Sequence, residues 1–231
     1  MSVQLYYEEK GNGEPLILLH GNGESHEYFV HQIEYFSQNY RVIAIDTRGH
    51  GKSMRGDTPF TIRQFALDLH CFMEDLGIQK SNILGFSDGG NIALIFALTY
   101  PEQVMKLILN GANLFGRGIK PHIQIPIILG YRFASLFADK SKEAAKKAEM
   151  LSLMVNDPDI RPQELSRITA RTLVIAGTGD MIKTAHTRLI YENLPDAELV
   201  FIRGNHFIAN RKFVEFNKEV ERFLQEAGGR P

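Results

Sequence analysis

Ser87 has a sequence setting that suits nucleophilic catalysis. It lies in a Gly-x-Ser-x-Gly pattern at residues 85–89, between an apolar run and a helical segment. A serine on a sharp strand-to-helix turn takes strained backbone angles that expose its hydroxyl group, and small residues two positions away let the chain turn without collision. The pattern therefore predicts Ser87 as a nucleophile, with an ordinary glycine-rich loop as the alternative interpretation.

A serine hydroxyl is a poor nucleophile at neutral pH and needs an adjacent base. Of the eight histidines, only His206 follows the last predicted strand and precedes the last predicted helix. Asp180, on the loop after the preceding strand, is the candidate carboxylate that holds the imidazole in the required tautomer. The alternatives are a surface-loop histidine for His206 and a helix N-cap for Asp180. The three residues together predict acyl transfer.

Acyl transfer also requires donors for the oxyanion of its tetrahedral intermediate. One expected donor is the backbone N–H of Asp88, directly after the nucleophile. The second is expected in His20-Gly21-Asn22-Gly23, which follows an apolar run, and the backbone N–H of Asn22 is the best candidate. The glycines would let the backbone approach a substrate closely. The alternative for this segment is a plain turn.

Apolar runs alternate with amphipathic segments along the chain, which predicts the elements that position these residues. Strands are predicted at 16–19, 41–46, 82–86, 106–110, 172–176 and 198–202, and helices at 61–76, 90–100, 123–137, 142–155 and 213–223. Residues 3–9 are expected to add an antiparallel edge hairpin through the turn at 11–13. The fold class is therefore α/β with a mostly parallel sheet covered by helices on both faces. In such a sheet the candidate catalytic residues all follow carboxyl ends of strands.

The segment 113–168 contains no predicted strand and reads as a helical insertion of about 50 residues within a domain of ordinary size. The expected organisation is a core in two parts, 1–112 and 169–231, separated by this insertion. No internal repeat marks a further domain.

Composition excludes several other classes of protein. The chain has 231 residues, 26 Lys and Arg against 27 Asp and Glu, and a single cysteine. The net charge of −1 offers no excess of positive charge for nucleic acid or an anionic membrane, and one cysteine excludes an internal disulfide framework or a multi-cysteine zinc site. With no signal peptide or long apolar run, we expect a soluble cytoplasmic protein, monomer or homodimer, that needs neither a cofactor nor a metal.

Five motifs together resemble the α/β-hydrolase superfamily. They are the segments at 20–23, 46–53, 85–90, 179–180 and 204–207, and they occur in the family's order over residues 3 to 226. The resemblance implies an eight-stranded, mainly parallel sheet with a helical cap between strands six and seven. Substrate selection then falls to the cap, where Phe115, Ile125 and Phe133 are candidate pocket residues. The alternative is that these three residues pack in the core of the cap, which would produce the same sequence pattern.

A narrower resemblance concerns Ser87-Asp88-Gly89-Gly90, Tyr100-Pro101 and the segment 110–113. These are similar to the biphenyl-hydrolase-like, or valacyclovir-hydrolase, group and to small bacterial carboxylesterases. The expected function is hydrolysis of small carboxylic esters. The first alternative is an α-amino-acid ester hydrolase in which Asp88 binds the substrate amine, where the plainer role of Asp88 is to anchor a loop. The second is a small-molecule receptor with an intact triad. Thioesters, lactones and carbon–carbon bonds remain open as substrates.

Overall fold

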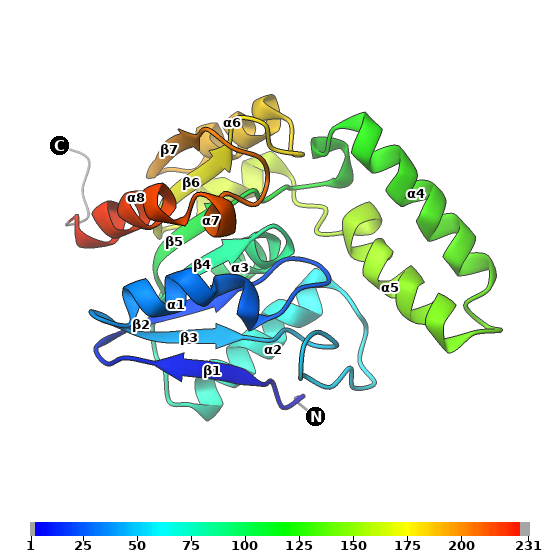
Figure 1. The fold of residues 1–231 in the computed structure, drawn as a ribbon, viewed down its shortest axis with the longest axis horizontal. Helices are drawn as coiled ribbons and strands as arrows, with labels where there is room; N and C mark the ends of the chain where they lie inside the picture. Colours follow the sequence, from blue (N-terminus) through cyan, green and yellow to red (C-terminus); the bar gives the residue numbers. More distant parts are fainter. Residues whose placement is uncertain (1–2, 227–231) are drawn as a thin grey trace.

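A seven-stranded sheet forms the centre of the molecule in the computed structural model, which describes residues 3–226 (Figure 1). The strands are β1 (Tyr7–Lys10), β2 (Glu14–Leu19), β3 (Tyr40–Ile45), β4 (Ser81–Phe86), β5 (Val104–Asn110), β6 (Arg171–Gly177) and β7 (Ala197–Ile202). Their order across the sheet is β1-β3-β2-β4-β5-β6-β7. All neighbouring strands are parallel except β1, which runs antiparallel to β3.

Two expectations about the sheet are wrong in detail. The described chain forms seven strands instead of eight, although the predicted class holds. The expected hairpin between residues 3–9 and the next strand is also absent from residues 3–226, because β2 already pairs with β3 on one side and with β4 on the other. β1 therefore pairs with β3 at the edge of the sheet.

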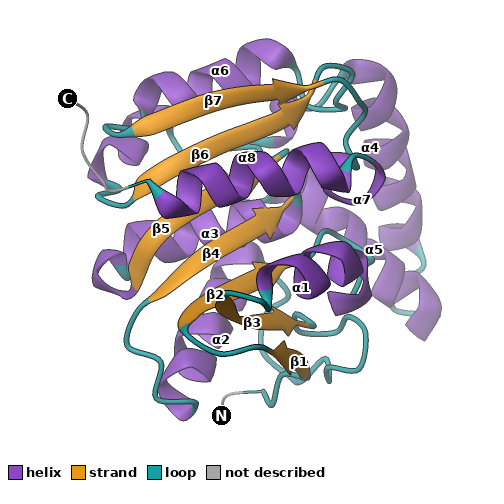
Figure 2. Ribbon diagram, turned by 60° about the vertical axis from the view of Figure 1, so that its left-hand side comes forward, coloured by secondary structure: helices purple, strands orange, loops and turns teal. Residues whose placement is uncertain are grey.

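Helices cover both faces of the sheet (Figure 2). They are α1 (Val30–Phe36), α2 (Ile62–Asp75), α3 (Asp88–Thr99), α4 (Pro121–Leu136), α5 (Lys142–Asn156), α6 (Thr184–Asn193), α7 (Ile208–Arg211) and α8 (Phe213–Gln225). Four short 3-10 segments are η1 (His26–Phe29), η2 (Pro101–Gln103), η3 (Gly116–Gly118) and η4 (Pro162–Arg167). Helices α1, α6 and α7 were not predicted from the sequence.

Alternate side chains of the buried strands build two separate cores. On β2, Ile17 and Leu19 pack in the cluster that contains α2 and α3, whereas Leu16 and Leu18 pack with residues of α1 and α8. Successive side chains of a strand point to opposite faces, so an unbroken apolar run is the pattern that a sheet covered on both sides requires.

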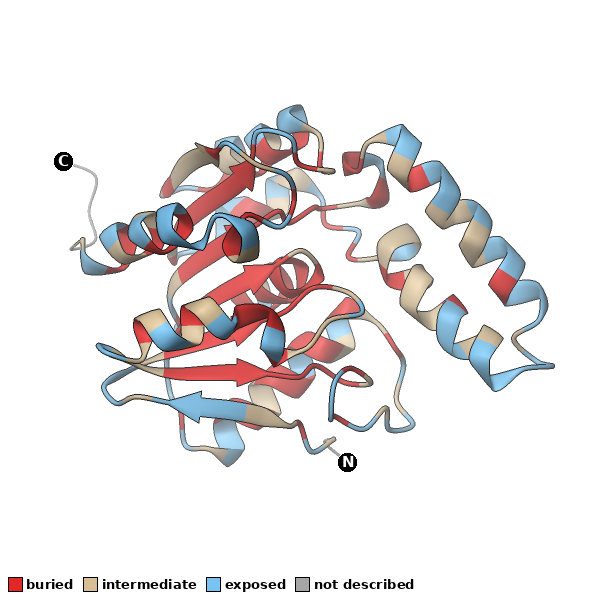
Figure 3. Cartoon of the chain, viewed as in Figure 1, coloured by how far each residue is buried: buried red, intermediate tan, exposed pale blue. Residues whose placement is uncertain are grey.

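Helices α4 and α5 of the insertion form a helical hairpin, which we call the cap. It lies beside the rest of the molecule, which we call the sheet domain (Figure 1). In the chain, the cap lies between β5 and β6. The resemblance implies a place between strands six and seven of eight, and because the described chain has seven strands, the insertion follows the fifth strand instead of the sixth. Much of its surface is exposed (Figure 3). Helix α5 carries contacts to the domain: the Arg55 Nε and Glu149 Oε2 atoms lie 2.9 Å apart, and Leu153 joins the larger core cluster.

The loop after β3 is fixed by a buried ion pair. The Arg48 guanidinium donates to both carboxylate oxygens of Asp68 on α2, at 2.6 and 2.5 Å, and both side chains are almost fully buried. Arg48 Nη1 also donates to the carbonyl of Arg55 at 3.1 Å.

Within residues 3–226, no helix combines the length and the apolar character needed to cross a bilayer.

We expect Arg48→Ala to lower the free energy of unfolding by about 3–5 kcal/mol, because it leaves the Asp68 carboxylate buried without its partner. Arg41→Ala is the matched control, since Arg41 forms the same kind of bidentate pair with Glu9 where both side chains are about one-third exposed. Its expected loss is about 0–1 kcal/mol. Urea denaturation measures both, and equal losses would contradict the account of this loop.

Candidate active site

Four loops meet at the carboxyl edge of the parallel strands. Asn22 follows β2, Ser87 follows β4, Asp180 follows β6 and His206 follows β7. The chain leaves β2 for one neighbour and returns to pair its other side with β4, so the sheet order reverses beside β2. Open α/β sheets form their binding crevice at such a reversal. The fold therefore brings together residues that are far apart in sequence.

Ser87 sits on a strained turn between β4 and α3. Its φ of 53° and ψ of −118° lie where residues with a side chain are rarely found. The turn needs glycines around it: a Cβ on Gly85 would lie 2.3 Å from the carbonyl oxygen of Gly89, and one on Gly89 would lie 2.0 Å from the carbonyl oxygen of Leu19. The two glycines predicted as turn-formers are thus sites of close backbone contact.

His206 connects the other two predicted residues. Its Nδ1 atom lies 2.7 Å from Asp180 Oδ1, and its Nε2 atom lies 3.0 Å from Ser87 Oγ. Because a carboxylate oxygen accepts, Nδ1 carries the proton and the neutral ring presents Nε2 as an acceptor for the serine hydroxyl. Asp180 Oδ1 also accepts from the backbone N–H of Ile182 at 2.8 Å. Asp180 and His206 are buried, whereas Ser87 is partly accessible.

Gly111 is a site residue that the sequence reasoning used only as part of a family resemblance. It has a φ of +64°, and a Cβ there would lie 2.7 Å from His206 Cε1 and 2.8 Å from His206 Nδ1. The absence of a side chain leaves room for the imidazole beside Asp180. In the sequence it is a glycine that directly follows the predicted strand 106–110. In the sheet this strand lies between β4, which leads to Ser87, and β6, which leads to Asp180.

Two backbone N–H groups, in the loops after β2 and β4, have no acceptor in the part of the chain that the structure describes. They are the N–H groups of Asn22 and Asp88, the predicted oxyanion donors. Asp88 is the first residue of α3, so its N–H also lies at the positive end of the helix dipole. The neighbouring N–H of Gly21 is already used, since it donates to Glu24 Oε2 at 3.2 Å.

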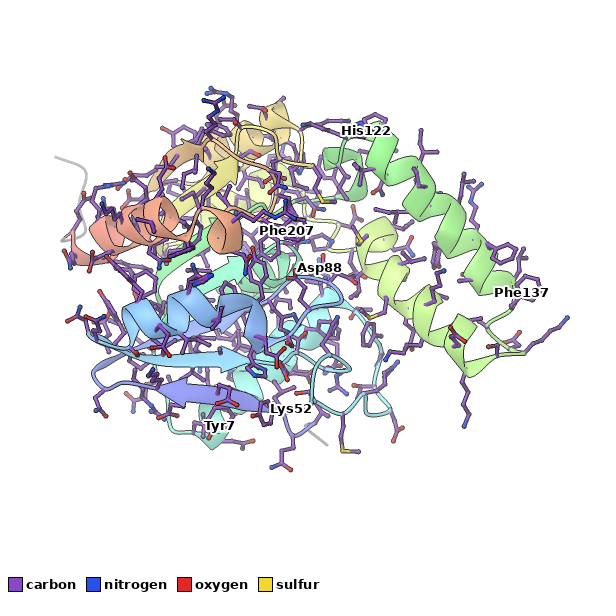
Figure 4. All side chains as sticks on the ribbon, viewed as in Figure 1. Tyr7, Lys52, Asp88, His122, Phe137 and Phe207 are labelled. Atoms are coloured by element: carbon purple, nitrogen blue, oxygen red, sulfur yellow. The ribbon has the colours of Figure 1, made fainter. Side chains whose placement is uncertain are left out.

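The Asn22 side chain joins the serine loop to the cap. Its Nδ2 donates to Asp88 Oδ2 at 2.9 Å and to the carbonyl oxygen of Met150 on α5 at 2.8 Å. Asp88 Oδ1 accepts from Asn91 Nδ2 at 3.3 Å. Figure 4 shows Asp88 on the side of the domain that faces α5. Both oxygens of Asp88 thus hold protein amides, and burial raises the pKa of this carboxyl to about 6.

Glu24 is a second residue that the sequence reasoning did not single out. Its carboxylate accepts from the backbone N–H of Gly21 at 3.2 Å, and a Cβ on Gly21 would lie 3.0 Å from both Glu24 Oε2 and the Phe86 ring. Burial raises the pKa of Glu24 to about 7, and the nearby His206 acts in the opposite direction. No pattern marked it, because an isolated glutamate in a turn is ordinary surface composition.

The three predicted pocket residues do not gather at the serine. Phe115 stacks edge-on against His186 and lines a cavity of about 540 Å³ at the base of the cap, whose lining includes neither Ser87 nor His206. Ile125 and Phe133 lie on α4 with 56% and 67% of their surface exposed. Within residues 3–226, no cluster of three or more His, Cys, Asp or Glu side chains is arranged to hold a metal ion.

Comparisons with a family model and with curated proteins agree on one family. The family model for the alpha/beta hydrolase fold matches residues 14–154, more than half of the chain. The human serine hydrolase BPHL is 29% identical over 96% of this chain and 84% of its own length. A 2-hydroxy-6-oxononadienedioate/2-hydroxy-6-oxononatrienedioate hydrolase of Burkholderia vietnamiensis is also 29% identical, over 96% of this chain and 91% of its own length.

Solved structures share the whole architecture. The enol-lactonase from Burkholderia xenovorans LB400 superposes with a TM-score of 0.82 over 97% of both chains, and at 24% identity this likeness concerns the fold alone. Est816, described as an N-acyl homoserine lactone degrading enzyme, gives a TM-score of 0.76 at 27% identity over 96% of this chain and 97% of its own. With the Ser87 turn, the sheet order and the family match taken together, this chain belongs to the α/β-hydrolase family and is a hydrolase.

Proposed function

We propose that this chain hydrolyses small carboxylic esters through an acyl-enzyme on Ser87. The observation that carries the proposal is the pair of short contacts, 3.0 Å from Ser87 Oγ to His206 Nε2 and 2.7 Å from His206 Nδ1 to Asp180 Oδ1. Both lie within the range of a hydrogen bond in which a base activates a nucleophile and a carboxylate orients that base.

The proposed reaction has two steps. Ser87 Oγ attacks the ester carbonyl while His206 Nε2 takes its proton, and the oxyanion accepts from the N–H groups of Asn22 and Asp88. His206 then returns the proton to the departing alcohol. In the second step, His206 takes a proton from water while the water oxygen attacks the acyl carbon. His206 then returns the proton to Ser87 Oγ as the acyl–oxygen bond breaks, which releases the carboxylic acid and restores the free serine. Asp180 stabilises the imidazolium in both steps.

The names of the relatives support hydrolysis without selecting one substrate. Their printed names include a serine hydrolase, a hydrolase of oxo-dienedioates and an enol-lactonase. A serine nucleophile with an oxyanion site suits hydrolysis at a carbonyl carbon, as in an ester or a lactone. Simple esters are the substrates that test the nucleophile with the fewest other requirements.

The amino-acid ester alternative depends on Asp88. Its carboxylate is buried, and both oxygens already accept from the side-chain amides of Asn22 and Asn91. A substrate ammonium group would have to reach this buried carboxylate and share it with the Asn22 amide, which also holds Met150 of the cap. These contacts favour the role of Asp88 as an anchor for the loop that carries Asn22.

Ser87→Ala is expected to reduce the multiple-turnover rate on p-nitrophenyl acetate and butyrate by on the order of 10⁶-fold, because the nucleophile is lost. Ser166→Ala, an exposed serine whose hydroxyl bonds to the Gln163 carbonyl, is the control and should leave the rate unchanged. Retained hydrolysis in Ser87→Ala would contradict the nucleophile. A single turnover by the wild-type chain would instead favour the receptor alternative.

Gly111→Ala is expected to lower kcat by roughly 10²-fold while the chain remains folded, since the new Cβ must displace the His206 ring from the serine. Gly77→Ala is the matched control. Gly77 has nearly the same φ, +65°, but no atom lies within 4 Å of a Cβ built there. It should lose about 1 kcal/mol of stability and no activity. Equal activity in both variants would show that Gly111 does not position the imidazole.

Asp88→Asn is expected to leave the preference between a phenylalanine ester and the matching phenylpropionate ester unchanged, because the Asp88 oxygens hold amides of the protein. Asp139→Asn, on the exposed turn between the cap helices, is the control for the loss of a negative charge. Rates on the paired esters measure the ratio. A selective fall for the phenylalanine ester would establish amine recognition by Asp88 instead.

A further inference from the structure

Helix α4 carries a stripe of large apolar side chains that nothing in residues 3–226 covers. Ile125, Leu129, Phe133 and Leu136 are 56%, 59%, 67% and 74% exposed, and we call these four residues the α4 stripe. Their spacing of four, four and three residues places them on one face of a helix. A contiguous apolar surface of this kind on a water-soluble domain marks a contact surface.

The α4 stripe faces away from the remainder of the molecule. The opposite face of α4 is occupied, since Gln124 and Ala134 are buried and Gln124 Nε2 donates to the Met154 carbonyl on α5. At about 100° per residue, the centre of the stripe lies close to half a turn from the direction midway between these two residues. Helix α5 lies between α4 and the sheet domain, and His122 and Phe137 mark the two ends of α4 along this outer edge (Figure 4).

The charges around the stripe have one sign. Residues 118–138 contain no Asp or Glu, whereas Arg132 flanks the apolar side chains. Lys147 of α5 lines a groove beside Phe133 and Phe137, where Glu143 is the only acidic residue of the lining. Within residues 3–226, Arg132 and Lys147 form no ion pair, so their charges are available to a partner.

The positive and negative charges of the chain are unevenly distributed, although the net charge is near zero. Residues 116–156 contain seven Lys and Arg against three Asp and Glu, while the remainder contains 19 against 24. One of the three cap acids, Glu149, is already paired with Arg55. An anionic surface would therefore attract the cap and repel the sheet domain, which fixes the orientation of docking as well as its strength.

A second copy of this chain is the less favourable occupant. A twofold contact centred on the α4 stripe would bring the Arg132 side chains of the two copies close together, with no acidic residue of α4 to compensate. Like charges placed together across an interface oppose association. Exposed Leu, Ile and Phe side chains flanked by Lys and Arg are instead the composition of helices that lie flat in a lipid interface.

We propose that α4 docks the chain on the surface of an anionic phospholipid bilayer. The α4 stripe enters the boundary between headgroups and acyl chains, and Arg132 and Lys147 contact the lipid phosphates. The helix lies parallel to the surface over its length of about 24 Å. This docking is independent of the reaction proposed for Ser87.

Vesicle co-sedimentation of the full chain tests the proposal. At low salt we expect binding to vesicles of phosphatidylcholine mixed with phosphatidylglycerol, little binding to phosphatidylcholine alone, and release by added salt. Leu129→Glu should weaken binding by roughly tenfold or more, and Arg132→Gln by about fivefold, the effect of one cation near such a surface. Circular dichroism and thermal unfolding check that each variant remains folded.

Two control variants locate the contact. Met54→Glu replaces a side chain that is 73% exposed on the sheet domain and should bind as the wild type does. Val214→Glu alters a second exposed apolar residue, which lies among Arg211, Lys212 and Lys218 near the start of α8, and should also bind normally.

Several outcomes would overturn the proposal. They are failure to bind either vesicle, equal binding to neutral and anionic vesicles, and loss of binding in Val214→Glu but not in Leu129→Glu. A fourth outcome comes from sedimentation velocity. If the wild-type chain forms a concentration-dependent dimer that Leu129→Glu dissociates, and binds no vesicles, a second copy is the occupant of the α4 stripe.

Discussion

The close approach of backbone segments around Ser87 is the constraint on which the site depends. Strand β4 turns into α3 so sharply that Gly85 and Gly89 contact neighbouring backbone at distances that exclude a Cβ. This turn holds Ser87 in a strained conformation with its hydroxyl toward His206 and places the N–H of Asp88 at the start of a helix. The burial of both faces of the sheet supplies the stabilisation that a strained residue requires.

Polar contacts then tie this turn to the cap. Asn22 bonds through one side-chain amide to Asp88, beside the serine, and to the Met150 carbonyl of α5, while its own backbone N–H stays without an acceptor in the described chain. The position of the cap and the position of a candidate oxyanion donor are therefore linked through a single residue. The apolar face of the outer helix α4 has no such contacts with residues 3–226, which separates its surface from the chemistry of the site.

The sequence predicted well those features that depend on local pattern. Continuous apolar runs located the strands, and the Gly-x-Ser-x-Gly turn located Ser87, which the fold places within hydrogen-bonding distance of His206. Features set by packing between distant segments were missed. The room that Gly111 leaves for His206 arises only when these two loops come together in the folded chain. Helical periodicity likewise could not tell which face of α4 is buried, so Ile125 and Phe133 were expected near substrate and instead lie on the outside.

The covalent intermediate tests the central claim most directly. Mixing the wild-type chain with p-nitrophenyl acetate, quenching in acid within the first turnover and measuring the intact mass should reveal a population heavier by one acetyl group. Fragmentation should place that group on Ser87. An acetyl group found only on other residues, or hydrolysis that proceeds with no acylated chain at any time after mixing, would contradict an acyl-enzyme formed by Ser87 and His206.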